Sequence, residues 1–306
     1  MTHRETQAAI RGARWVDPRA LARIQSLELL ARTVVDGFIN GLHRAPHLGF
    51  SLDFAEHRSY EPGDDLRRVD WRLFARTDRY FVKQFEADSN ANCVVALDVS
   101  TSMRYGSGGI SKLDYGRYLA ASLLYFSHTQ RDRLGLVTFD RDVIEYVPAS
   151  AKHLEYALTA LDRIGTPSPG SLAAPLLTTT ERLHRRGIVI VISDLYEEAD
   201  AVASAIKPLR FRGHDVIVFH LLDPTELDFP FTEPASFEDV ETGQKMPVVP
   251  DSLREQYRTL VRQHISTLER LFTGSRIDYA VFDTSVPLDH ALFRYLSARE
   301  RLRRAR

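Results

Sequence analysis

Two apolar runs that both lead into an aspartate constrain the fold of this chain more than any other feature. Residues 93–97 and 188–192 contain only Cys, Val, Ala, Leu and Ile. Apolar runs without alternation are typical of strands that are buried on both faces of a parallel sheet. Asp98 follows the first run directly, and Asp194 follows the second run after Ser193. The pattern therefore predicts two carboxylates at the carboxyl edge of one sheet.

Strand and helix patterns alternate along the C-terminal two thirds of the chain. We predict strands at 92–98, 132–139, 142–148, 187–193, 214–222 and 276–282, and helices near 113–128, 150–163, 172–185, 199–211, 252–272 and 288–302. This alternation predicts an α/β fold with a doubly wound, mainly parallel sheet. Because only Asp140 and Arg141 separate two of the strands, those two should form a hairpin with one antiparallel edge strand.

Changes in composition divide the chain into three parts. Residues 1–41 form an N-terminal segment, with a helix that we expect to begin at Asp17-Pro18 and to end at Gly41. Residues 42–91 are rich in charged and aromatic side chains and predict a small β-rich subdomain, with strands at 50–54 and 80–85 around the turn at Pro62-Gly63. Residues 92–306 form the α/β domain, with an insertion near 223–250 whose hairpin should turn at Thr242-Gly243.

The bulk composition excludes several classes of protein. The 306 residues carry a formal net charge of −1, which favours neither nucleic acid nor an anionic membrane surface as a partner. No apolar stretch reaches the roughly 18 residues that a membrane span needs, and the opening residues do not resemble a signal peptide. The single cysteine, Cys93, cannot form an internal disulfide. We therefore expect a cytoplasmic protein without nucleic-acid binding or direct membrane insertion.

Side-chain oxygens collect where the two apolar strands end. Asp98-x-Ser100-x-Ser102 follows the first strand, Asp194 follows the second, and Ser171 lies in a loop that precedes a helical pattern. Carboxylate and hydroxyl oxygens suit a hard cation such as Mg²⁺ or Mn²⁺, and ligands of open α/β sheets bind at this edge. The same residue types also serve as turn residues and helix caps, which is the competing interpretation.

Two sets of motifs resemble known families. Asp98-x-Ser100-x-Ser102, the loop hydroxyl and Asp194 resemble the metal-ion-dependent adhesion site of von Willebrand factor type A domains. Upstream, residues 56–71 read EHRSYEPGDDLRRVDW, and Ala75-Arg76 and Val82-Lys83 follow; this segment resembles the signature of the bacterial domain-of-unknown-function family 58, DUF58. The resemblance implies that Ser100, Ser102 and the loop hydroxyl contact the metal directly. It implies that Asp98 and Asp194 act mostly through water.

Two details of the resemblance leave alternatives open. The loop hydroxyl is usually a threonine, so Thr166 competes with Ser171 for that role; we prefer Ser171 because it directly precedes the helical pattern. The family resemblance implies a non-catalytic adaptor of a MoxR-type AAA+ ATPase, whose acidic side chain would complete the metal's coordination. The alternatives are a metal-dependent hydrolase or phosphatase and a metal-free structural interaction domain. A phosphotransferase of the haloacid dehalogenase type would need an acid where Ser100 stands.

The charged block of the second part has two interpretations. It can form an internal network in which arginines pair with aspartates over a packed Trp71, or it can be a second surface for the ATPase. The residues of this block are Arg58, Tyr60, Asp64, Asp65, Arg67, Asp70, Trp71 and Arg76.

Overall fold

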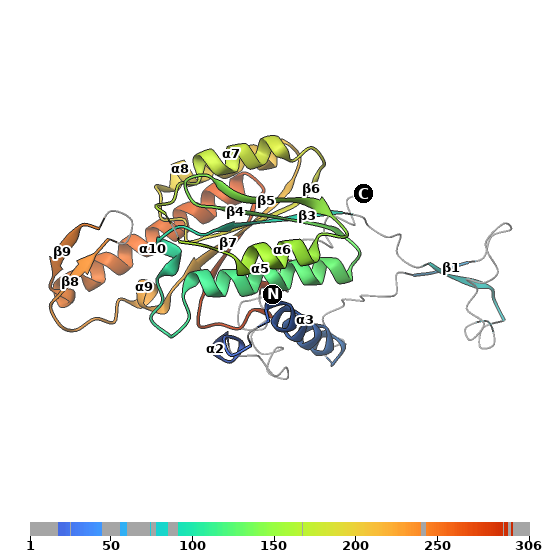
Figure 1. The fold of residues 1–306 in the computed structure, drawn as a ribbon, viewed down its shortest axis with the longest axis horizontal. Coiled ribbons are helices and arrows are strands. Elements are labelled where there is room, and N and C mark those ends of the chain that lie inside the picture. Colours follow the sequence, from blue (N-terminus) through green and yellow to red (C-terminus); the bar gives the residue numbers. More distant parts are fainter. Residues whose placement is uncertain are drawn as a thin grey trace.

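A computed structural model of the chain describes most of the α/β domain and parts of the segments before it. The described residues are 18–24, 26–44, 56–59, 74, 78–84, 91–166, 168–239, 243–289, 291–292 and 295. The fold within these ranges is drawn in Figure 1.

A six-stranded sheet forms the centre of the molecule, in the order β10-β7-β6-β3-β4-β5. The strands are β3 (Asn92–Asp98), β4 (Arg133–Phe139), β5 (Val143–Ser150), β6 (Gly187–Ser193), β7 (Asp215–Leu222) and β10 (Asp278–Asp283). All neighbouring pairs are parallel except β4 and β5. The doubly wound α/β class is therefore confirmed, and so is the hairpin with an antiparallel edge strand.

Helices cover both faces of the sheet (Figure 1). α5 (Lys112–Thr129) and α6 (Leu154–Asp162) lie on one face, and α7 (Ala173–Arg182), α8 (Ala199–Phe211) and α10 (Pro250–Gly274) lie on the other. Successive β3 side chains belong to different cores, because Val95 packs in the first cluster and Val94 in the second. Of the predicted helix at 288–302, residues 288, 289, 291, 292 and 295 are described, and all except 288 are helical.

The N-terminal helix differs from the prediction in two ways. The structure has a short helix, α2 (Pro18–Leu21), and a separate longer helix, α3 (Leu27–Arg44). The Ser26 hydroxyl accepts a hydrogen bond from the Leu29 N–H at 3.3 Å, which favours a new helix start there. Gly41 does not end the helix, which continues to Arg44; a glycine inside a helix costs only about 1 kcal/mol relative to alanine and so need not end it.

Only part of the predicted β-rich subdomain is described. β1 (Glu56–Ser59) pairs antiparallel with β2 (Phe81–Gln84), which confirms the strand predicted at 80–85. Within β1, Arg58 is opposite Val82, and nearby the rings of Phe74 and Tyr80 stack at 4.5 Å. The strand predicted at 50–54 lies outside the described residues, and so do Tyr60, Asp64, Asp65, Arg67, Asp70, Trp71 and Arg76.

The insertion after β7 forms an arm. It comprises the short helix α9 (Pro224–Asp228) and the strands β8 (Ala235–Glu238) and β9 (Lys245–Val248), which pair antiparallel. The predicted hairpin is therefore confirmed, and Gly243 has a positive φ of 71°, which glycine adopts at low cost. This insertion arm projects beside α10, at the left of Figure 1.

Candidate metal centre

The candidate site lies where the winding of the sheet reverses direction. From β3 the chain continues to β4 on one side, whereas β6, the neighbour of β3 on the other side, continues to β7. Ligands of doubly wound sheets bind at the carboxyl ends of the two strands at such a point. Asp98 ends β3 and Asp194 follows β6, and both side chains are buried. The structure therefore brings the two predicted aspartates to one place.

The Asp98 carboxylate is held by hydroxyl and amide donors. Its Oδ1 accepts the Ser100 N–H at 2.9 Å, and its Oδ2 accepts the Ser193 hydroxyl at 2.6 Å. Burial, together with the nearby charge of Asp194, raises the pKa of Asp98 to about 7. Such a carboxylate lacks sufficient compensation for its charge, and a cation beside it would stabilise the ionised form.

Ser100 and Ser102 present their hydroxyls together. Both residues are buried, and their Oγ atoms lie 3.1 Å apart. The 3-10 helix η3 (Ser102–Arg104) begins in this loop and sets the spacing of the two side chains. Two neighbouring hydroxyls beside a carboxylate form a set of hard oxygen donors.

A third loop packs against these serines. The Thr101 N–H donates to the Ser168 carbonyl at 3.1 Å, and a Cβ added to Gly170 would lie only 2.6 Å from the Ser100 Cβ. Only glycine fits at this approach without a shift of the backbone. Ser171, the next residue, is half-buried and its N–H donates to the Asp140 carbonyl at 3.1 Å, whereas Thr166 is exposed. The structure thus brings the Gly170-Ser171 loop to the site.

The turn after β6 is fixed by an unusual backbone conformation. Leu195, which directly follows Asp194, has a φ of 49°, a region that residues with a Cβ rarely occupy. Its N–H donates to the Ser193 hydroxyl at 3.1 Å, and that hydroxyl donates to Asp98. A non-glycine residue in this region is characteristic of sites whose geometry is held by their surroundings.

Sequence reasoning missed a buried lysine that contacts one of the two aspartates of the site. Lys112 is 0% exposed, and its Nζ lies 2.9 Å from Asp194 Oδ2 and 2.7 Å from Glu226 Oε1. Burial alone would lower the pKa of Lys112, but the charges of Asp194 and Glu226 raise it above its ordinary value. The one available signal was its position at the start of a helix, where a cation opposes the helix dipole and so needs another partner.

The insertion arm supplies the second acid of this lysine. Glu226 lies in α9, and its Oε1 also accepts the Tyr196 hydroxyl at 2.5 Å. The Tyr196 ring lies 4.5 Å from Lys112 Nζ. Asp223 caps α9 and accepts the Ser107 N–H at 2.8 Å, so the loop before α5 is fastened to the end of β7. Lys112 is thus contacted by side chains from the turn after β6 and from the insertion arm.

The charges of the cluster leave room for a divalent cation. Asp98, Asp194 and Glu226 are three carboxylates, and among the described residues Lys112 is the one ammonium that lies between two of them. When all four groups are ionised, two negative charges remain uncompensated. Among the described residues no group of three or more His, Cys, Asp or Glu side chains is arranged to hold a metal, so hydroxyls are needed as ligands. The donor set of Asp98, Ser100 and Ser102 therefore fits a hard cation.

Fold and site together define a doubly wound α/β protein with a buried cluster of acids and hydroxyls at its switch point. The family model described as "Protein of unknown function DUF58" matches residues 56–267, and the chain belongs to this family. The uncharacterized protein Rv1480 of Mycobacterium tuberculosis is 28% identical over 268 residues, which cover 84% of this chain and 83% of that protein. The uncharacterized protein Mb1516 of Mycobacterium bovis matches with the same identity and coverage.

Several solved structures resemble the α/β domain at low identity. The conserved hypothetical protein BatB from Bacteroides thetaiotaomicron has a TM-score of 0.49 and 18% identity, covering 68% of this chain and 97% of that one. The SpRpn10 VWA domain has a TM-score of 0.40 and 11% identity, covering 66% and 93%. Separately, no helix in the described part of the chain has both the length and the apolar character to cross a membrane.

Proposed function

We propose that this protein is a non-catalytic, metal-dependent protein-binding module. Mg²⁺ or Mn²⁺ would be held at the site formed by Asp98, Ser100, Ser102, Ser171 and Asp194, and an acidic side chain of a partner would complete its coordination. The observation that carries this proposal is the cluster of three carboxylates with one ammonium, beside two buried hydroxyls at the switch point.

The contacts of Asp194 support an indirect role for this residue. One of its oxygens already accepts a hydrogen bond from Lys112 at 2.9 Å. Asp194 would therefore contribute charge without contacting the metal directly, and Ser100 and Ser102 would supply neutral oxygens. A metal with few anionic ligands keeps a strong attraction for a further carboxylate. An acidic group on a partner protein supplies that carboxylate, so the metal would link the two proteins.

The identity of the partner rests on the family rather than on the site. Resemblance to DUF58 proteins implies a MoxR-type AAA+ ATPase in the cytoplasm, with this protein as its adaptor or cofactor. In support, the chain belongs to that family over residues 56–267.

A metal-free interaction domain is the second candidate, and one observation favours it. Lys112 is a permanent cation inside the site and already neutralises part of the acidic cluster. If that compensation suffices, a partner could bind the same edge without a metal. The phosphatase alternative has less support, because Ser100 lies where a second acid is needed.

Calorimetric titration of the full chain with Mg²⁺ tests the proposal. We expect saturable binding that Asp98→Asn and Ser100→Ala abolish, while the matched exposed variants Asp200→Asn and Ser204→Ala leave it unchanged. Capture of a MoxR-type ATPase should require metal and fail in chelator. Capture that persists in chelator with both site variants would favour the metal-free domain, and no binding at millimolar Mg²⁺ would contradict the metal site.

A further inference from the structure

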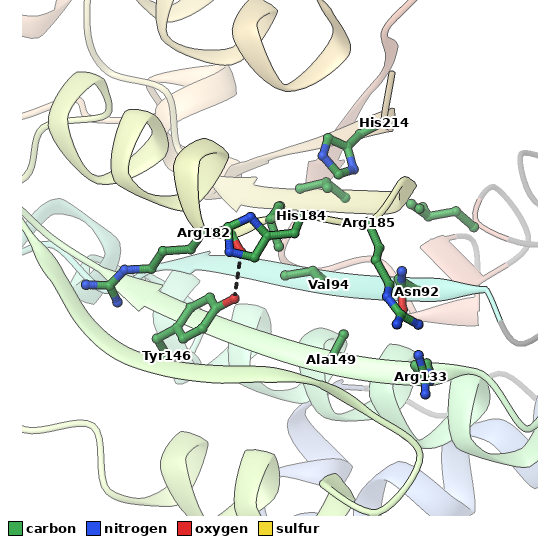
Figure 2. Close-up of a pocket in the computed structure, with 13 residues that line it drawn as sticks. Asn92, Val94, Arg133, Tyr146, Ala149, Arg182, His184, Arg185 and His214 are labelled. Atoms are coloured by element: carbon green, nitrogen blue, oxygen red, sulfur yellow. Dashed lines mark hydrogen bonds between the residues drawn. The ribbon is translucent and has the colours of Figure 1, made fainter. Parts of the chain in front are cut away.

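A cavity of about 330 Å³ lies at the opposite edge of the sheet from the candidate metal centre, where β3, β4 and β6 begin (Figure 2). Its lining includes Asn92, Arg133, Tyr146, Arg182, Arg185 and His214. A seven-residue strand such as β3 spans roughly 20 Å, so the cavity and the metal centre are separate sites. We propose that this cavity binds a small phosphate-bearing molecule.

The lining of the cavity is strongly cationic. Of the 13 lining residues, three are arginines, two are histidines and none is acidic. None of Arg133, Arg182 and Arg185 is paired with an acidic residue within the described part of the chain. Asp215, the acid next to His214, already pairs with Arg210 at 3.3 Å. The charge of the arginines is therefore available to an anion.

His214 indicates that the cavity has a polar requirement of its own. The residue is 2% exposed, and its Nδ1 is buried without a hydrogen-bond partner. Buried polar atoms in native proteins are rarely left in this state, so the ring is a polar group that a shift in the wall of the cavity could expose to a ligand.

Close packing fixes the backbone beneath the cavity. A Cβ added to Gly187 would lie 2.3 Å from the Asn92 carbonyl oxygen, so β3 and β6 approach each other very closely there. The Asn92 amide donates to the Arg186 carbonyl at 3.2 Å, which ties the loop before β6 to the start of β3. In Figure 2 the Arg185 side chain extends toward Asn92. Arg133 on β4 is the register partner of Asn92 on β3. The backbone at the starts of β3 and β6, next to these cationic side chains, is therefore closely packed.

Helix ends explain only one of the three arginines. Arg182 lies in the last turn of α7, where a cation stabilises the helix dipole, and it also covers the Tyr146 ring at 5.2 Å. Arg133 begins a strand and Arg185 lies in a loop, so neither serves a helix end. These two guanidinium groups are the ones that we assign to ligand binding.

Phosphate matches the chemistry of these groups. Guanidinium forks bind phosphate oxygens through paired hydrogen bonds. A phosphate group in its monoanionic form also carries a hydroxyl, which can donate to a neutral imidazole nitrogen, and two histidines line the cavity. The cavity volume is at the lower end of the range for small-molecule sites, which favours a compact ligand.

Titration of the full chain with inorganic phosphate and with glycerol 3-phosphate tests the proposal. Chelator and 150 mM salt, roughly physiological ionic strength, exclude the metal centre and weak surface attraction. We expect saturable binding, a loss of at least tenfold in affinity for Arg133→Gln combined with Arg185→Gln, and no change for the exposed control pair Arg262→Gln and Arg270→Gln. His214→Phe should weaken binding while the arginines remain.

Several outcomes would overturn the assignment. These are no binding at millimolar ligand, equal losses in the cavity and control pairs, or unchanged affinity in both the arginine and histidine variants. Vesicles that contain phosphatidate form a second arm, because a lipid headgroup shares this chemistry. Binding of glycerol 3-phosphate alone supports a soluble ligand, and variant-sensitive binding of vesicles assigns the same phosphate site to a lipid.

Discussion

Replacing Lys112 with methionine should reveal how strongly the buried charge cluster depends on its ammonium. Lys112 is fully buried and contacts both Asp194 and Glu226, so the change leaves two buried carboxylates without their common partner. Methionine nearly conserves the volume of the side chain, so little of the loss comes from a cavity. Removing one partner of a buried ion pair costs about 3–5 kcal/mol, and we expect the free energy of unfolding to fall by this amount.

Urea denaturation followed by circular dichroism measures this loss. The exposed Lys152→Met variant is the control and should change stability by less than about 0.5 kcal/mol. Millimolar Mg²⁺ should restore more stability to the Lys112 variant than to the wild type, because the variant has three uncompensated carboxylates for the metal to bind. A loss below about 1 kcal/mol would refute the argument that the pair is desolvated. Abolished Mg²⁺ binding would show that the lysine supports the metal site rather than competing with it.

Three further perturbations test other parts of the structure. The pKa of Asp98 is raised to about 7, above its value in the unfolded chain. In chelator the free energy of unfolding should therefore fall as the pH rises from about 4 to about 7. Urea denaturation of Asp98→Asn across this range should show a smaller fall. Gly170→Ala should lower Mg²⁺ affinity at least tenfold in calorimetry by pushing its loop away from Ser100, whereas Gly165→Ala, where a Cβ meets nothing within 4 Å, should not. Phe126→Ala should cost about 3–5 kcal/mol in urea denaturation because the ring is fully buried, and a loss below about 1 kcal/mol would contradict the packing of α5.

Much of the sheet could be predicted because the sequences of its central strands are continuously apolar. The runs that became β3 and β6 are apolar at every position, since both faces of these strands are covered by helices. Their ends placed Asp98 and Asp194 at one edge, and the two-residue separation of β4 and β5 indicated a hairpin. Local pattern and tertiary structure agree in these segments.

The lysine cluster could not be predicted in the same way. Its members come from α5, the turn after β6 and the insertion arm, and their contacts appear only when these elements converge. The break between α2 and α3 was missed for a different reason. Leu21, Ile24 and Leu27 recur at helical spacing and indicate one continuous helix, which hid the cap at Ser26. Periodicity reports which side of a helix is buried, but it does not report whether the helix is continuous.

The insertion arm has an apolar cluster that is separate from the two cores of the sheet. The rings of Phe229, Phe231, Phe237 and Tyr257 contact one another at centroid distances of 4.7 to 5.6 Å. Arg254 and Arg258 of α10 hold its backbone through the carbonyls of residues 228, 229 and 231. Substitutions at the exposed tip of the arm should therefore leave the sheet undisturbed, as is common for surface loops. Because Glu226 at the base of the arm contacts Lys112, this contact is where a change in the position of the arm would reach the charge cluster.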